Sequence, residues 1–134
     1  MWMLIAATLA AGTLMTFTDW LFFGVLFHKR YLIHPEVWRY IGHGPQERSS
    51  ILWSSVMDYF VAAAFIALCD LFHITDLAPA LLVAVLAWIA GPLVVTVTNS
   101  LFVKIDPMVT AAHAIGYLAR FVIAAVAAAV VLPA

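Results

Sequence analysis

Charged side chains are scarce in this chain, and cysteine is almost absent. Only 10% of the 134 residues are Asp, Glu, Lys or Arg, whereas 66% are hydrophobic. This composition excludes an ordinary soluble domain, in which about a quarter of the residues are charged. The single cysteine, Cys69, excludes an intrachain disulfide and a cysteine-based zinc cluster. Because Cys69 stands within an apolar run, we expect it to be a buried small hydrophobic residue.

The chain also lacks an excess of charge of either sign. Six Lys and Arg residues are opposed by seven Asp and Glu residues, which gives a formal net charge of −1 at pH 7. This balance does not indicate the strongly basic surface that binds a nucleic acid, so we expect no nucleic-acid partner. The partner that the composition predicts is the lipid bilayer.

Four apolar stretches are each long enough to cross a bilayer, which takes about 20 helical residues. They cover residues 3–27, 50–72, 77–103 and 108–132. The first has no preceding Lys or Arg and no clear cleavage site, so we expect an uncleaved span and not a signal peptide. The four stretches lack the alternation of lipid-facing and lumen-facing residues that is typical of the strands of a membrane β-barrel. The sequence predicts an all-α integral membrane protein, a four-transmembrane-helix bundle forming a single domain over residues 1–134.

Basic residues outside the spans occur in only two of the connecting loops. The loop between the first and second spans and the loop between the third and fourth contain Lys29, Arg30, Arg39, Arg48 and Lys104. The N-terminus, the turn between the second and third spans and the C-terminus contain no Lys or Arg. The positive-inside rule therefore predicts that the two basic loops are cytoplasmic and that both termini lie outside.

The first of these loops has the pattern of a short interfacial helix over residues 35–42. Proline stands near its start, and glycine follows at its end. Trp38 and Tyr40 suit the headgroup zone and favour a membrane anchor, and the alternative is a lid over the cytoplasmic mouth. No compact metal-ligand spacing relates the three histidines of the loop, so we expect no metal site at His28, His34 and His43.

A short motif near the end of the first span recurs near the end of the third. Residues 16–22 and 96–102 both read Thr-x-Thr, then Asp or Asn, then x-Leu-Phe. A weaker match relates residues 58–63 to residues 120–125. Two helical hairpins that repeat in parallel about an axis along the membrane normal would account for both matches. The alternative is chance similarity between apolar segments of low complexity.

Polar residues inside the spans are the candidate site. An ionisable group in the bilayer costs a few kcal/mol or more unless it has a partner. With a rise of 1.5 Å per residue, the polar residues all fall in the cytoplasmic half of the bilayer and form one layer. The members of this layer are Asp19, Asp58, Asn99, His113, Tyr117 and Arg120.

One helical stripe of the fourth span carries half of this polar layer. Positions 113, 117 and 120 follow i, i+4, i+7 spacing, so the stripe is expected to face the bundle. We predict a buried ion pair between Arg120 and Asp58, with Asp19 as the other candidate counter-ion. We expect the hydrogen bonds of this pair to be completed by Asn99, Tyr117 and His113.

The polar layer has two interpretations. It locks the register of the helices, or it is a proton or ligand site in which the second carboxylate carries an exchangeable proton. In the third span Gly91 and Pro92 predict a kink, because proline removes a backbone hydrogen bond. Such breaks border binding sites in transporters and also occur in ordinary membrane helices. Only His113 lies well inside a span, so we expect neither haem nor another cofactor.

Three stretches resemble the DUF1761 family of small bacterial membrane proteins. They are the aromatic-rich residues 19–29, residues 98–102 at the end of the third span, and residues 112–117 at the start of the fourth. The resemblance extends from about Leu4 to Val131, and the longer first loop departs from the usual family form. The family has no characterised function. The resemblance therefore implies a four-helix protein of the bacterial inner membrane and no reaction.

Three functions remain open at this point. We favour a non-enzymatic protein that forms a homodimer or serves as an accessory subunit of a larger membrane complex, because pairs such as Ala6 and Ala10 allow close helix packing. The first alternative is a proton-coupled carrier or ligand-binding protein that uses Asp19, Asp58 and Arg120. The second is an enzyme acting on a lipid or quinone with His113 as acid or base. No catalytic motif is recognisable, so no catalytic residue is assigned.

Overall fold

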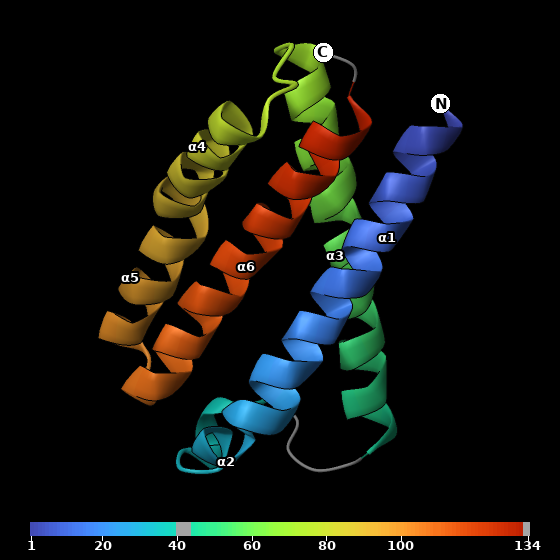
Figure 1. Ribbon diagram of the computed structural model, residues 1–134. Coiled ribbons are helices and arrows are strands. Elements are labelled where there is room, and N and C mark those ends of the chain that lie inside the picture. Colours follow the sequence, from blue (N-terminus) through green and yellow to red (C-terminus); the bar gives the residue numbers. More distant parts are fainter. Residues whose placement is uncertain (40–43, 133–134) are drawn as a thin grey trace.

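Four long apolar helices pack as a bundle in the computed structural model, which describes residues 1–39 and 44–132 (Figure 1). The helices long and apolar enough to cross a membrane are Trp2–Leu26, Pro45–Leu71, Leu77–Phe102 and Pro107–Val131. The predicted fold class, an all-α bundle with four candidate spans, is confirmed. The second helix begins earlier than expected, because Pro45 occupies its first turn, where the missing N–H group has no cost.

The first span changes its winding partway along. It begins as α1 (Trp2–Asp19), continues without interruption as the π-helix η1 (Trp20–Leu26), and is followed by the short helix α2 (His28–Tyr31). The wider winding is visible in the backbone, where the N–H group of Phe27 donates to the carbonyl of Phe22 at 2.9 Å. The change of winding begins directly after Asp19.

The predicted interfacial helix over residues 35–42 is wrong in its length. Of its described residues, 35–39, Pro35–Val37 are helical, as the 3-10 turn η2, and Trp38 is extended. The ring of Trp38 packs against Tyr31, with 4.9 Å between the ring centroids, which draws the chain back toward α2. The end of the predicted helix, including Tyr40, lies outside the described residues, as does His43.

The other three spans contain one further π-helical segment. The second span is α3 (Pro45–Leu71), and the fourth is α6 (Pro107–Val131). The third consists of α4 (Leu77–Trp88), η3 (Ile89–Leu93) and α5 (Val94–Phe102). The expected irregularity at Gly91 and Pro92 therefore takes the form of a π-helical turn that accommodates the proline within a continuous helix.

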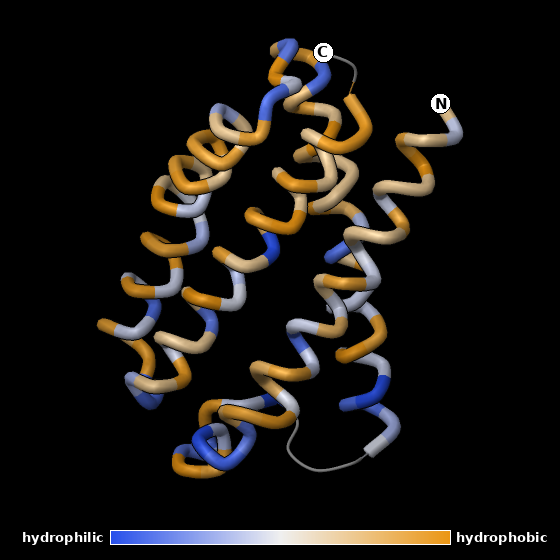
Figure 2. The backbone as a smooth tube through the Cα atoms, viewed as in Figure 1, coloured by the Kyte–Doolittle hydropathy of each residue, from blue (hydrophilic) through white to orange (hydrophobic). Residues whose placement is uncertain are grey.

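Helix α6 lies at the centre of the bundle. Helices α4 and α5 pack against one side of it, whereas α1 and α3 pack against each other and against its other side (Figure 1). The small residues Ala124, Ala125 and Ala128 of α6 are fully buried, which lets the neighbouring helices approach closely. Many of the larger apolar side chains are exposed, and hydrophobic residues occur along the whole length of the four long helices (Figure 2). This arrangement suits a protein surrounded by lipid.

The two basic loops lie at the same end of the bundle, as the distribution of charge predicts. Arg30 of α2 lies 3.9 Å from Asp106, which precedes α6, and Lys104 lies 3.6 Å from Glu36. These contacts tie the first loop to the turn between α5 and α6. The beginning of α1 and the turn between α3 and α4 are at the opposite end (Figure 1).

Candidate functional site

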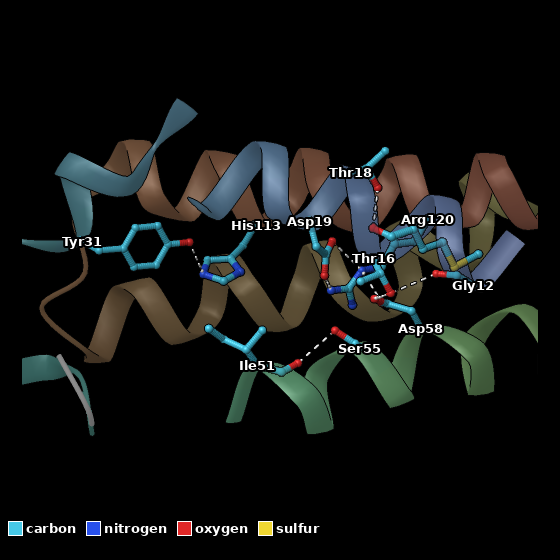
Figure 3. A network of polar contacts seen from close by, with 11 residues as sticks. Gly12, Thr16, Thr18, Asp19, Tyr31, Ile51, Ser55, Asp58, His113 and Arg120 are labelled. Carbon is cyan, nitrogen blue, oxygen red and sulfur yellow. Dashed lines mark hydrogen bonds and ion pairs between the residues drawn. The ribbon is translucent and has the colours of Figure 1, made fainter. Parts of the chain in front are cut away.

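Three charged residues from three helices meet inside the bundle. The Nε atom of Arg120 donates to Oδ1 of Asp19 at 3.0 Å, and its Nη2 atom donates to Oδ2 of the same carboxylate (Figure 3). The Nε atom also lies 3.1 Å from Oδ1 of Asp58. The predicted ion pair between Arg120 and Asp58 is confirmed, but the bidentate partner is Asp19. We call these three residues the ion cluster.

The three charged residues come from different positions along their helices, and all three side chains lie in the bundle interior. Asp19 is the last residue of α1 before the π-helix, whereas Asp58 and Arg120 stand near the middles of α3 and α6. Asp58 is fully buried, and the side chains of Asp19 and Arg120 are only 13% and 10% exposed. An arginine held in a fork by a carboxylate at this depth gains both charge pairing and directional hydrogen bonds.

Asp58 is incompletely hydrogen-bonded. Its Oδ2 atom accepts a hydrogen bond from Thr16 at 3.1 Å, and the Thr16 hydroxyl also lies 3.0 Å from the carbonyl of Gly12. Its Oδ1 atom is buried and has no hydrogen-bond partner in the described part of the chain, although it lies beside the guanidinium of Arg120. With both carboxylates ionised, the ion cluster has a net charge of −1. An uncompensated buried charge is costly, so this cluster is short of one positive charge.

The other predicted members of the polar layer do not all join the cluster. Tyr117 does, because the Cζ atom of Arg120 lies 4.9 Å from the centroid of its ring. His113 instead forms a 2.9 Å hydrogen bond with the hydroxyl of Tyr31 and stacks on Phe23, with 4.6 Å between the centroids. Asn99 is exposed on α5. The expectation that Asn99, Tyr117 and His113 complete the hydrogen bonds of the ion pair is therefore wrong, since Tyr117 contacts Arg120 with the face of its ring.

The hydrogen bond between Tyr31 and His113 fastens α2 to α6. Burial raises the pKa of Tyr31 well above its ordinary range, so the phenol keeps its proton. Its hydroxyl therefore remains available as a hydrogen-bond donor to the imidazole. Trp38 packs on Tyr31 of the same loop, and Tyr31 is hydrogen-bonded to His113 of α6, so these two contacts together hold the first basic loop against the end of the bundle.

A partly open cavity of about 540 Å³ lies at the loop end, between the first span, α2 and the beginning of α3. We call it the loop-end cavity. Its walls are rich in aromatic side chains, namely Trp20, Phe23, Tyr31 and Trp38. The remaining lining residues are Thr16, Asp19, Gly24, His28, Leu32, Glu47, Ile51, Ser54 and Ser55. Thus Asp19 belongs both to this cavity and to the ion cluster.

A second cavity, of about 450 Å³, lies between the third span and α6. Pro92, Asn99, His113 and Tyr117 are among its lining residues, and Trp38 lines both cavities. The hydrogen bond between Tyr31 and His113 therefore joins a wall of the first cavity to a wall of the second.

Several residues of the site were not predicted from the sequence. Thr16 could have been found, because it stands three positions before Asp19 and so shares its helical face. No sequence signal connects Phe23 and Tyr31 to the site, since their positions depend on the π-helix and on the folding back of the first loop. Trp38 belongs to the segment for which a lid over the cytoplasmic mouth is the alternative interpretation.

Together these features define a class: a four-span helical membrane protein with a buried ion cluster of one arginine and two aspartates. Within residues 1–39 and 44–132, no group of three His, Cys, Asp or Glu residues is placed to hold a metal ion. Comparisons with protein-family models, with curated proteins and with solved structures give no match to this chain. The resemblance to the DUF1761 family remains an expectation from the sequence.

Proposed function

We propose that this chain binds a small solute in the loop-end cavity and couples its binding to protonation of the ion cluster. The observation that carries the proposal is the double role of Asp19. The residue lines the cavity, and its carboxylate is at the same time the bidentate partner of Arg120. A solute that interacts with Asp19 therefore acts directly on the charge balance of the cluster.

The shortage of positive charge supplies the proton site. Two carboxylates share one guanidinium, and the carboxylate of Asp58 is fully buried with one oxygen lacking a hydrogen bond. A proton on Asp58 removes the net charge of the cluster and relieves the cost of its burial. The groups that face this carboxyl are Asp19 and Thr16 from α1 and Arg120 from α6.

The geometry offers a simple route for the coupling. The Nε atom of Arg120 is 3.0 Å from the carboxylate of Asp19 and 3.1 Å from that of Asp58. If a solute weakens the interaction with Asp19, the guanidinium can shift its hydrogen bonds to Asp58 with little movement. Asp58 then becomes the paired carboxylate and releases its proton. Proton-coupled transport of the solute requires in addition that the cavity opens toward the opposite side of the membrane.

The side of the membrane follows from the basic loops. Because Lys and Arg concentrate at the loop end, the positive-inside rule favours a cytoplasmic mouth for the cavity and termini on the outside. In a bacterium this would be the inner membrane. The aromatic rings at the mouth suit the interfacial zone of such a bilayer.

Infrared difference spectra of the purified chain between acidic and alkaline pH test the proton site. We expect the wild type to show the C=O band of a protonated carboxylic acid that disappears as the pH rises. The other six Asp and Glu residues also give such a band in acid, so the readout is the difference between the wild-type and variant spectra. Asp58→Asn is expected to lose the part of the band that Asp58 contributes, because the amide cannot titrate. Asp70→Asn, at an exposed position of the same helix, is the control and should lose only the contribution of an exposed carboxyl. If the spectra of Asp58→Asn and Asp70→Asn differ from that of the wild type in the same way, the proposal is contradicted.

Self-association is the second candidate function, alone or within a larger membrane complex. Ala6 and Ala10 are exposed, lie one turn apart on α1 and leave a face on which a second helix can pack closely. We expect Ala6→Ile with Ala10→Ile to abolish dimers detected by crosslinking in vesicles. Ala63→Ile, at an exposed position of α3, should leave them unchanged. A wild-type chain that is monomeric in vesicles rules this candidate out.

A further inference from the structure

We propose that the solute of the loop-end cavity is a lipophilic organic cation. This inference rests on the proposed function, to which it adds the chemical class of the ligand. Three properties of the cavity lead to it: the aromatic character of its walls, the sign of the charge at its inner end, and its size.

The walls supply flat, apolar and electron-rich surfaces. Trp20 and Phe23 come from η1, Tyr31 from α2, and Trp38 from the segment that folds back after η2. The faces of aromatic rings attract organic cations, and they also provide the apolar contacts that a drug-sized ligand needs. A small inorganic cation would instead require a compact set of ligands, and no group of three His, Cys, Asp or Glu residues in the described part of the chain is placed to hold a metal ion.

The charge at the inner end has the matching sign. No Lys or Arg occurs among the lining residues in the described part of the chain, whereas two acidic residues, Asp19 and Glu47, line the cavity, and His28 is the one lining residue that can gain a positive charge. Behind it, Asp58 adds a second negative charge, and Arg120 compensates only one of the two. A surplus negative charge in surroundings of low dielectric gives the cavity a potential that attracts cations and repels anions.

The size of the cavity is that of a binding site for a small organic molecule. Its volume of about 540 Å³ falls within the range of roughly 300–1,000 Å³ typical of such sites. Since the cavity lies at the loop end of the apolar spans, a lipophilic cation concentrated at the membrane surface would reach it without crossing the bilayer.

The class of ligand fixes the sign of the coupling to protons. A bound cation and a proton on Asp58 compensate the same surplus charge, so they compete. Binding should therefore release a proton and become tighter as the pH rises. The other titratable or charged groups at the cluster are Asp19 on α1 and Arg120 with Tyr117 on α6.

Equilibrium dialysis of the chain in nanodiscs, corrected with empty nanodiscs, tests the inference with two probes of the same shape. Tetraphenylphosphonium is a cation, and tetraphenylborate is an anion of nearly identical size. We expect saturable binding of tetraphenylphosphonium, at least tenfold tighter than that of tetraphenylborate, with proton release in weakly buffered solution. Asp58→Asn should weaken binding of the cation about tenfold and remove the proton release that Asp58 contributes, because the cluster becomes neutral while the cavity lining, including His28 and Glu47, is unchanged. Asp70→Asn should bind as the wild type does.

The outcomes separate this inference from the proposed function. If tetraphenylborate binds saturably and more tightly than tetraphenylphosphonium, the cavity binds solutes as proposed but the ligand is not a cation. If Asp58→Asn binds tetraphenylphosphonium as tightly as the wild type, the charge argument is wrong. If neither probe binds, the inference of a cationic ligand is overturned. If the infrared signal of Asp58 is then still observed, the proton site of the proposed function is supported, but binding of a solute is not.

Discussion

Replacing Arg120 with methionine is expected to destabilise the folded bundle by about 3–5 kcal/mol, because the change leaves two buried carboxylates without their shared cation. Asp19 loses a bidentate partner, and Asp58 loses the guanidinium beside its Oδ1 atom. The measurement is the free energy of unfolding of the purified chain in mixed micelles, followed by helical circular dichroism as the fraction of SDS rises.

Two further variants separate the loss of charge pairing from the loss of packing. Arg120→Met combined with Asp19→Asn and Asp58→Asn removes all three charges and should recover most of the stability. Arg48→Met, at an exposed position of α3, should unfold as the wild type does. If Arg120→Met alone is as stable as the wild type, the ion cluster does not contribute to holding the three helices together.

The second large effect is expected at Gly12, where α1 crosses α3. A Cβ atom at this position would overlap the ring of Tyr59 and lie 2.7 Å from its Cγ atom, so Gly12→Ala forces the ring of Tyr59 to move. The hydroxyl of Tyr59 lies 3.1 Å from that of Thr13, and the shift would disrupt this hydrogen bond as well. We expect a loss of about 1–3 kcal/mol in the free energy of unfolding, measured in the same micelles.

Gly91→Ala is the matched control for this prediction. An added Cβ at Gly91 meets no atom of another helix within 4 Å, so no loss of stability from crowding between helices is expected. Combining Gly12→Ala with Tyr59→Ala makes room for the new methyl group and should restore part of the loss. A Gly12→Ala variant as stable as Gly91→Ala would show that the crossing tolerates a wider separation of the two helices.

The fold and the charged centre of the site could be predicted from the sequence because both follow from one constraint. Lipid excludes polar groups, so long apolar runs reveal the spans. The same exclusion means that charges within the spans must find one another. Arg120, Asp58 and Asp19 are therefore predictable as partners. The sequence favours Asp58 as the counter-ion, whereas the bidentate partner is Asp19, because the choice between the two aspartates depends on how α1 is rotated about its axis.

The rest of the site depends on features that hydropathy does not encode. Helical spacing placed His113 correctly on the stripe of α6 that faces the bundle, yet its hydrogen-bond partner is Tyr31, from a loop outside the spans. Asn99 occupies the position that corresponds to Asp19 in the possible repeat, but it is exposed. Similar residues in similar motifs therefore have different neighbours, because α5 lies at the edge of the bundle and α1 packs against both α3 and α6.

The π-helix that begins directly after Asp19 has a consequence for how such a site can change. A π-helical turn holds an extra residue, so the chain beyond it is rotated by roughly 100° from the position that an uninterrupted α-helix would give it. Deleting one residue from Trp20–Leu26 would leave α1 and the ion cluster in place while turning a different set of side chains toward the cavity. In evolutionary terms, insertions and deletions in this segment can alter what the cavity accepts without altering the charged centre to which the cavity leads.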